Sequence, residues 1–252
     1  MSDFDRNYAA STRGYAPDRA VIDAGLRAHM IRVYNYMAIG VALTGLVAWF
    51  TFQAAATTTA AGGLVLTPLG QTLFNSPLIW VLMLAPLALV FVLSLGINRL
   101  SAPAAQALFF VYAALLGLSL STIFVAFTET SITRVFFISA AAFGGLSLWG
   151  YTTQRDLTGM GSFLIMGLIG IIIASLVNIF LKSSGLDWII SVIGVIVFAG
   201  LTAWDTQKIK EMYSPMDDGT IAGRKAVMGA LSLYLDFNNL FLMLLRLFGD
   251  RR

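Results

Sequence analysis

Seven stretches of about 20 mostly apolar residues run through this chain of 252 residues, and they constrain its fold more than any other feature. Each is long enough to cross the hydrocarbon core of a membrane as a helix, where a helix pairs its own backbone polar groups. The second stretch contains Pro86, which a membrane helix tolerates as a kink. The stretches are 33–53, 78–97, 104–127, 135–153, 160–181, 188–206 and 227–247.

The composition excludes several other classes of protein. Hydrophobic residues make up 58% of the chain and charged residues only 12%, half the usual share of a soluble domain. Cysteine is absent and His29 is the single histidine, so we expect neither a disulfide nor a His-ligated metal site, and no bound cofactor. No basic cluster with interleaved aromatics points to nucleic acid. We predict an all-α polytopic bundle of seven transmembrane helices over 33–249, embedded in the lipid bilayer.

The distribution of Lys and Arg predicts the orientation of the bundle. Residues 1–32 are polar, carry nine charges and lack the apolar core of a signal peptide, so we predict a cytoplasmic N-terminal segment. With this end inside, eleven Lys and Arg face the cytoplasm and five face outward, in agreement with the positive-inside rule. Arg246, Arg251 and Arg252 oppose the rule, and a re-entrant last segment would return them to the cytoplasm. Apolar length nevertheless favours a full seventh span.

Two carboxylates, Asp205 and Asp236, lie inside otherwise apolar stretches. An ionised carboxylate at the bilayer centre costs about 2.5–3.5 kcal/mol on insertion scales, so each needs a partner, a cavity or a proton. Asp236 is ten residues from Arg246 and eleven from Lys225, far from any loop. For Asp205 the alternative is that it only caps the cytoplasmic end of its helix, since Lys208 follows closely.

The spacing of the two aspartates predicts that they face each other. Their midpoint lies next to Gly219 in the turn-rich MDDGT sequence, and residues equidistant from the turn of two antiparallel helices lie at similar depth. Asp236 also belongs to a helical stripe, although ordinary packing of small and polar residues is an alternative explanation for much of it. The stripe comprises Ser232, Asp236, Asn239, Met243 and Arg246.

Two carboxylates that face each other can share a proton near neutrality, which makes the pair a candidate pH sensor. When ionised, the pair also offers the hard oxygen ligands that Ca²⁺ prefers. Asn239, Asn238 and Gln207 could add oxygens, or could equally bond neighbouring helices. Arg99, at the cytoplasmic end of the second span, could clamp an ionised aspartate, or could simply reach to lipid headgroups.

The run AWDTQ at the end of the sixth span, followed by ALSLYLDFNNLFLMLLRLFG, closely resembles the signature of the Bax inhibitor-1 (transmembrane Bax inhibitor motif) family in its bacterial branch. The resemblance implies a bundle in which the other helices surround the last one, in the inner membrane of a bacterium. It also implies a pH-sensitive passive Ca²⁺ leak controlled by an aspartate pair, here Asp205 and Asp236. The basic latch of the closed state corresponds to Arg99, while the second span here lacks any acidic residue.

Other functions are compatible with parts of this pattern. Some relatives act by binding a membrane-bound protease, so a regulator that binds a membrane protein and transports nothing is the main alternative. Intramembrane aspartyl proteases also place aspartates on consecutive helices, but their Gly-x-Gly-Asp sequence is replaced here by Leu233-Tyr234-Leu235-Asp236. We therefore expect no enzyme activity, and Ca²⁺ and protons as the ions handled.

Overall fold

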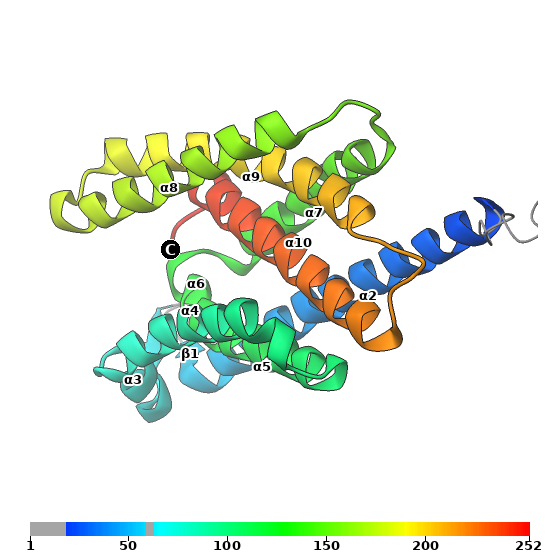
Figure 1. Cartoon of the computed structure of the whole chain (residues 1–252). Helices are drawn as coiled ribbons and strands as arrows, with labels where there is room; N and C mark the ends of the chain where they lie inside the picture. The colour runs from blue at the N-terminus through cyan, green and yellow to red at the C-terminus, as the bar shows by residue number, and fades with distance from the viewer. Residues whose placement is uncertain (1–18, 59–62) are drawn as a thin grey trace, which may run out of the picture.

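The computed structural model describes residues 19–58 and 63–252 and is almost entirely helical (Figure 1). Within this part of the chain, seven helices are long and apolar enough to cross a membrane, which confirms the predicted fold class. They are α2 (Arg19–Ala55), α4 (Leu78–Gly96), α5 (Ala102–Leu120), α7 (Glu129–Thr152), α8 (Thr158–Leu181), α9 (Ser184–Glu211) and α10 (Gly219–Phe248). Pro86 lies inside α4, where the sequence placed it.

Short elements connect some of the long helices. The predicted polar loop between the first two spans contains an antiparallel hairpin of β1 (Ala56–Thr58) and β2 (Leu64–Leu66), then α3 (Pro68–Phe74). The 3-10 turn η1 (Ile97–Arg99) follows α4, and α6 (Ile123–Ala126) lies between α5 and α7. Thr67 begins α3 by accepting a hydrogen bond from the backbone N–H of Gly70, with Pro68 in the first turn.

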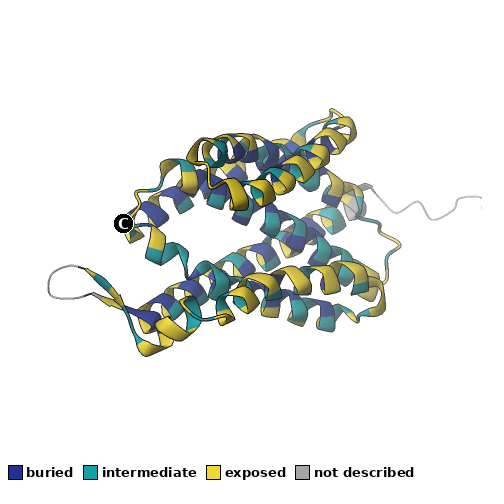
Figure 2. Cartoon of the chain, turned by 90° about the vertical axis from the view of Figure 1, so that its left-hand side faces the viewer, coloured by how far each residue is buried: buried dark blue, intermediate teal, exposed yellow. Residues whose placement is uncertain are grey.

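The last helix, α10, lies at the centre of the bundle. It packs against α9, α2, α7 and α5, and 72% of its apolar window is buried, against 11% for α4 and for α8. Figure 2 shows the exposed residues on the outward faces of the surrounding helices and the buried residues turned inward. This arrangement suits a membrane protein, because the outer helices can present apolar side chains to lipid while the buried carboxylate of Asp236 lies on the central helix.

The helices extend further than the apolar stretches predicted. Helix α2 begins at Arg19, within the segment expected to be polar and without a core, while residues 1–18 lie outside the described residues. Helix α10 begins at Gly219, where Asp218 caps it by accepting a hydrogen bond from the N–H of Ile221 at 2.7 Å. Hydropathy detects only the part of a helix at hydrocarbon depth, so polar helical ends escape it.

All seven long helices cross between the same two ends of the bundle. At the end where α2 begins, Tyr213 of the α9–α10 connection lies against Gly25, and Arg224 donates a hydrogen bond to the carbonyl of Leu100. At the other end, the backbone of Arg252 bonds that of Ala126 at 3.0 Å. Because α10 runs from the first end to the second over about 45 Å, it is long enough for the full seventh span that the apolar length predicted.

The C-terminal arginines, which opposed the positive-inside rule, have acidic partners at the second end. Arg246 and Arg251 lie 3.4 and 3.8 Å from the carboxylate of Asp187, at the start of α9. Arg252 lies 3.5 Å from Glu129, at the start of α7. These exposed pairs contribute little stability individually, but they lower the positive charge that this end presents.

Candidate functional site

Asp236 lies in the middle of α10 and is 5% exposed. Its Oδ2 atom is one of two buried side-chain atoms in residues 19–58 and 63–252 that have no hydrogen-bond partner, the other being Nε2 of His29. Buried polar groups are normally paired, and one that is not points to strain, to function or to a partner that is absent. For a carboxylate among apolar helices, a proton or a cation is such a partner.

Asp205 is the residue that Asp236 faces. It lies on α9, is half-buried, and its carboxyl interacts directly with that of Asp236, side chain to side chain. The contact of Gly229 with Ile209 and that of Gly194 with Met243 set an antiparallel register centred close to Gly219. The structure therefore brings together the two aspartates that the sequence singled out.

The pair opens into a groove of about 660 Å³, here called the aspartate groove, framed by α8, α9 and α10 with Leu87 of α4 at one edge. Apolar side chains of α8, such as Ile165 and Ile172, form most of one wall. The polar lining residues besides the aspartates are Ser175, Lys208, Ser232 and Asn239. Charges in such a largely apolar groove interact more strongly than in bulk water, because fewer dipoles screen them.

Lys208 is the cation that acts on Asp205, one helical turn further along α9. Its Nζ atom lies 4.8 Å from the centre of the Trp204 ring, an exposed cation–π contact that holds the ammonium group beside the groove. From the sequence, Lys208 was considered only because it supports the alternative that Asp205 caps the end of its helix. Its place three residues after Asp205, on the same helix face, was the available signal.

Arg99, the predicted latch, is exposed at the end of η1. It does not line the aspartate groove, and the ion pairs of the described residues do not include it. The structure thus does not bring Arg99 to Asp205 or Asp236. The basic residue beside the aspartate pair is Lys208, whereas the sequence had suggested Arg99 for this place.

Of the three predicted auxiliary residues, only Asn239 lines the groove. Gln207 is buried elsewhere: its Oε1 accepts a hydrogen bond from the N–H of Leu157 at 2.9 Å, and its Nε2 donates to the carbonyl of Arg155 at 2.8 Å. It holds the α7–α8 connection, in agreement with the alternative that this side chain bonds neighbouring parts of the bundle. Asn238 also faces away and donates to the carbonyl of Tyr234 at 2.7 Å.

The neighbours of Asp205 in the AWDTQ run have structural tasks. Thr206 shares a hydrogen bond of 2.9 Å with Ser147 of α7, which shares another of 2.6 Å with Tyr34 of α2. Trp204 packs against α8 where Gly161 leaves room, since a Cβ atom at that glycine would lie 2.2 Å from the indole. The run therefore ties α9 to α2, α7 and α8 around the aspartate.

The oxygen atoms at the groove suit a passing cation better than a resident one. Ca²⁺ takes six to eight oxygen ligands. Two carboxylates and the side chains of Asn239 and Ser232 leave several positions to water, and no group of three or more His, Cys, Asp or Glu that could hold a metal occurs among the described residues. Such a site can attract a cation and release it again.

A network absent from the sequence predictions lies on the opposite side of α10. The hydroxyl of Tyr234 shares a hydrogen bond of 2.5 Å with Thr44 of α2, and the single hydroxyl hydrogen of Thr44 can donate to the carbonyl of Gly40 or to that of Ala113, each 2.9 Å away. Tyr234 is fully buried. It fixes the rotation of α10, and so the direction in which Asp236 points, because the two residues share one rigid helix.

The chain is similar to known proteins over nearly its whole length. Residues 26–252 match the family described as "Inhibitor of apoptosis-promoting Bax1". The "Inner membrane protein YbhL" of Escherichia coli is 50% identical over 91% of this chain and 94% of its own length. A Rickettsia prowazekii protein is 49% identical over 91% of this chain and 92% of its own, and a Caulobacter vibrioides protein 43% identical over the full length of both. The chain is therefore a polytopic membrane protein that belongs to the Bax inhibitor-1 family.

Proposed function

We propose that the protein is a passive calcium leak of the bacterial inner membrane, controlled by a proton shared between Asp205 and Asp236. The observation that carries the proposal is the buried, unpartnered carboxylate oxygen of Asp236 beside the carboxyl of Asp205, in a groove between α8, α9 and α10. The E. coli relative is named an inner membrane protein, which supports this location. The end of the bundle that holds the start of α2 is then cytoplasmic.

The proposed control follows from competition between protons and Ca²⁺ for the same oxygens. Two ionised carboxylates in direct contact repel each other strongly unless a proton or a cation lies between them. With a proton bound, the pair carries one negative charge instead of two and attracts a divalent cation less strongly. When the proton is released, Ca²⁺ can bind to the carboxylates in its place. The ion can then take up water ligands from the open side of the groove.

The charged groups around the pair set the balance of this competition. Lys208 is the cation beside the pair, and its ammonium group attracts the carboxylate of Asp205 while repelling Ca²⁺. Latching by Arg99 belongs, in this proposal, to a second conformation in which η1 moves toward the groove. Neither residue is needed for the proton exchange itself.

Calcium flux into liposomes that contain the purified protein and a Ca²⁺ dye tests the proposal. We expect influx above that of empty liposomes, and about tenfold less in Asp236→Asn, since removing one charge a few ångströms from the ion weakens its attraction. Asp156→Asn is the matched control. Asp156 is exposed in the α7–α8 connection, and hydrogen bonds from Thr158 lower its pKa, so it is an ionised carboxylate outside the groove.

Two results would contradict the proposal, the first by excluding a leak and the second by excluding the aspartate pair as its path. Flux no greater than in empty liposomes would leave the chain as a regulator that binds a membrane-bound protease or another membrane protein. Equal flux in wild type, Asp236→Asn and Asp156→Asn would place the ion path elsewhere in the bundle.

A further inference from the structure

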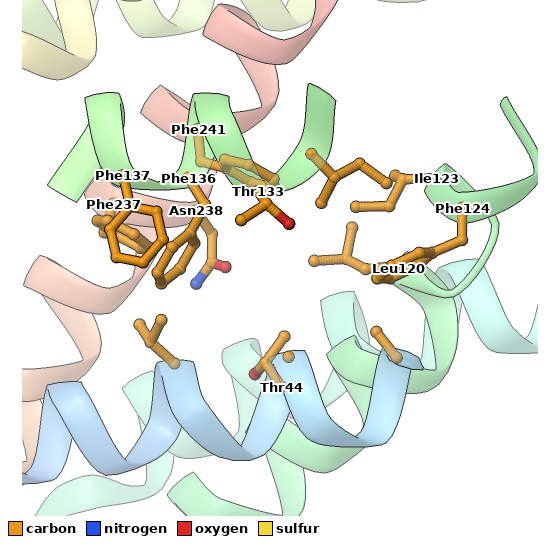
Figure 3. Close-up of a pocket in the computed structure, with 14 residues that line it drawn as sticks. Thr44, Leu120, Ile123, Phe124, Thr133, Phe136, Phe137, Phe237, Asn238 and Phe241 are labelled. Carbon is orange, nitrogen blue, oxygen red and sulfur yellow. The ribbon is translucent and has the colours of Figure 1, made fainter. Parts of the chain in front are cut away.

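A second cavity, separate from the aspartate groove, lies on the other side of α10 (Figure 3). It has a volume of about 340 Å³ and lies between α2, α7, α10 and the α5–α6 segment. Five phenylalanines line it, together with aliphatic side chains and three polar residues, Thr44, Thr133 and Asn238. In Figure 3, Thr44 lies on the α2 side of the space and faces Thr133 and Phe136 across it.

The mouth of this cavity opens between α2 and α7, on the surface that these helices present to the membrane. Gly45 and Thr133 are exposed at the mouth, and Phe137 is 66% exposed. Leu46 of α2 and Ile138 of α7, next to the mouth, are also large exposed apolar residues. The medium in contact with the opening is therefore hydrocarbon, as expected for the faces of spanning helices.

The depth of the cavity places it within one leaflet. Thr133 and Phe137 lie about 6 and 12 Å along α7 from its first residue, and Phe241 lies about 10 Å from the end of α10. Those helix ends mark the C-terminal end of the bundle. The cavity thus lies in the half of the hydrocarbon core nearer that end.

The polar residues of the lining offer little to water. Thr44 donates to a backbone carbonyl, Thr133 donates to the carbonyl of Glu129 at 2.9 Å, and Asn238 uses one of its two amide hydrogens to donate to that of Tyr234. A trapped water needs two to four polar partners, and an empty apolar space forfeits the dispersion contacts of its walls. The cavity is therefore suited to an apolar occupant that reaches it from the bilayer.

We propose that this cavity binds one acyl chain of a membrane phospholipid, inserted between α2 and α7 from the leaflet nearer the C-terminal end. An acyl chain is as apolar as most of the lining and needs no hydrogen bonds. The acyl chains of the bilayer also surround the mouth of the cavity. The cavity is separate from Asp205 and Asp236, so the lipid proposal does not depend on the calcium proposal.

Photo-crosslinking in nanodiscs tests the site, with a phosphatidylglycerol that carries a diazirine midway along one acyl chain. Wild type should be labelled preferentially at side chains that line the cavity, such as Phe136, Phe137 and Val41. Gly45→Leu should reduce this labelling about tenfold, the loss expected when roughly two methylene groups lose their buried contacts. A Cβ atom at Gly45 meets nothing within 4 Å, so the leucine fills the mouth without displacing the fold.

Gly145→Leu is the matched control, because Gly145 is exposed on α7, also has open space at its Cβ position and does not line the cavity. It should leave the labelling unchanged. Labelling spread evenly over the lipid-facing side chains of α4 and α8 would overturn the proposal. So would labelling at the cavity that persists in Gly45→Leu, since the probe would then lie outside the cavity.

Discussion

At the scale of single residues, helical geometry decides which parts of the signature act together. Successive residues are rotated by about 100° around a helix, so Gln207 lies some 200° from Asp205 and Asn238 some 200° from Asp236, on opposite faces. Asn239 returns to the side of Asp236 and does line the groove. The cost of buried charge predicted the two aspartates from sequence alone. The expectation that Gln207 and Asn238 could add oxygens beside the aspartates neglected this rotation. The exposed position of Arg99 depends on tertiary packing, which no local sequence pattern shows.

Gln207→Leu separates the two roles that the sequence allowed for this residue, a hydrogen bond within the bundle and an oxygen ligand in the ion path. The substitution removes one buried and one partly buried hydrogen bond to the α7–α8 connection, each worth about 1 kcal/mol, so we expect about 2 kcal/mol less stability. Calcium flux at a temperature where the protein stays folded should keep its wild-type dependence on pH. A thermal unfolding curve in detergent, measured beside the flux assay, checks both parts. Unchanged stability with an altered pH dependence would return Gln207 to the ion path.

At the scale of helices, hydropathy identified the seven spans but not their ends. The spans agree with the helices to within a few residues where polar residues follow immediately, as for α4 and α8. They fall short where a helix continues into water, as at Arg19 of α2 and at Gly219 of α10. The capping aspartate Asp218 was visible in the MDDGT sequence. The ion pairs of the C-terminal arginines could not be predicted from the sequence. Their acidic partners lie in the first turns of α7 and α9, far away along the chain.

The full crossing of α10 predicts where the C-terminus lies relative to the α9–α10 connection. Alkaline phosphatase fused after Arg252 should be active, since it folds only outside the cytoplasm, and a fluorescent protein at the same place should stay dark. A fluorescent protein inserted at Met216, which is exposed in the connection, should be bright. Reporters that place both positions on one side of the membrane would contradict the crossing.

At the scale of the whole molecule, the central helix separates two polar regions that share one rigid element. One face of α10 directs Asp236 to α9 and the aspartate groove, and another directs Tyr234 and Asn238 to α2. The pattern of apolar residues could not show which helix is central, because all seven spans are rich in apolar residues. The position of α10 at the centre depends on tertiary packing. The family resemblance supplied that expectation, and the burial of α10 confirms it.

The pH dependence of calcium flux in Asp205→Asn, Asp236→Asn and the double variant tests the central claim most directly. If the two carboxylates share one controlling proton, each single substitution removes the wild-type response to pH, and the double variant lacks this response as well, because the two residues act as a unit. Flux through the double variant that still follows pH as wild type does would contradict the claim.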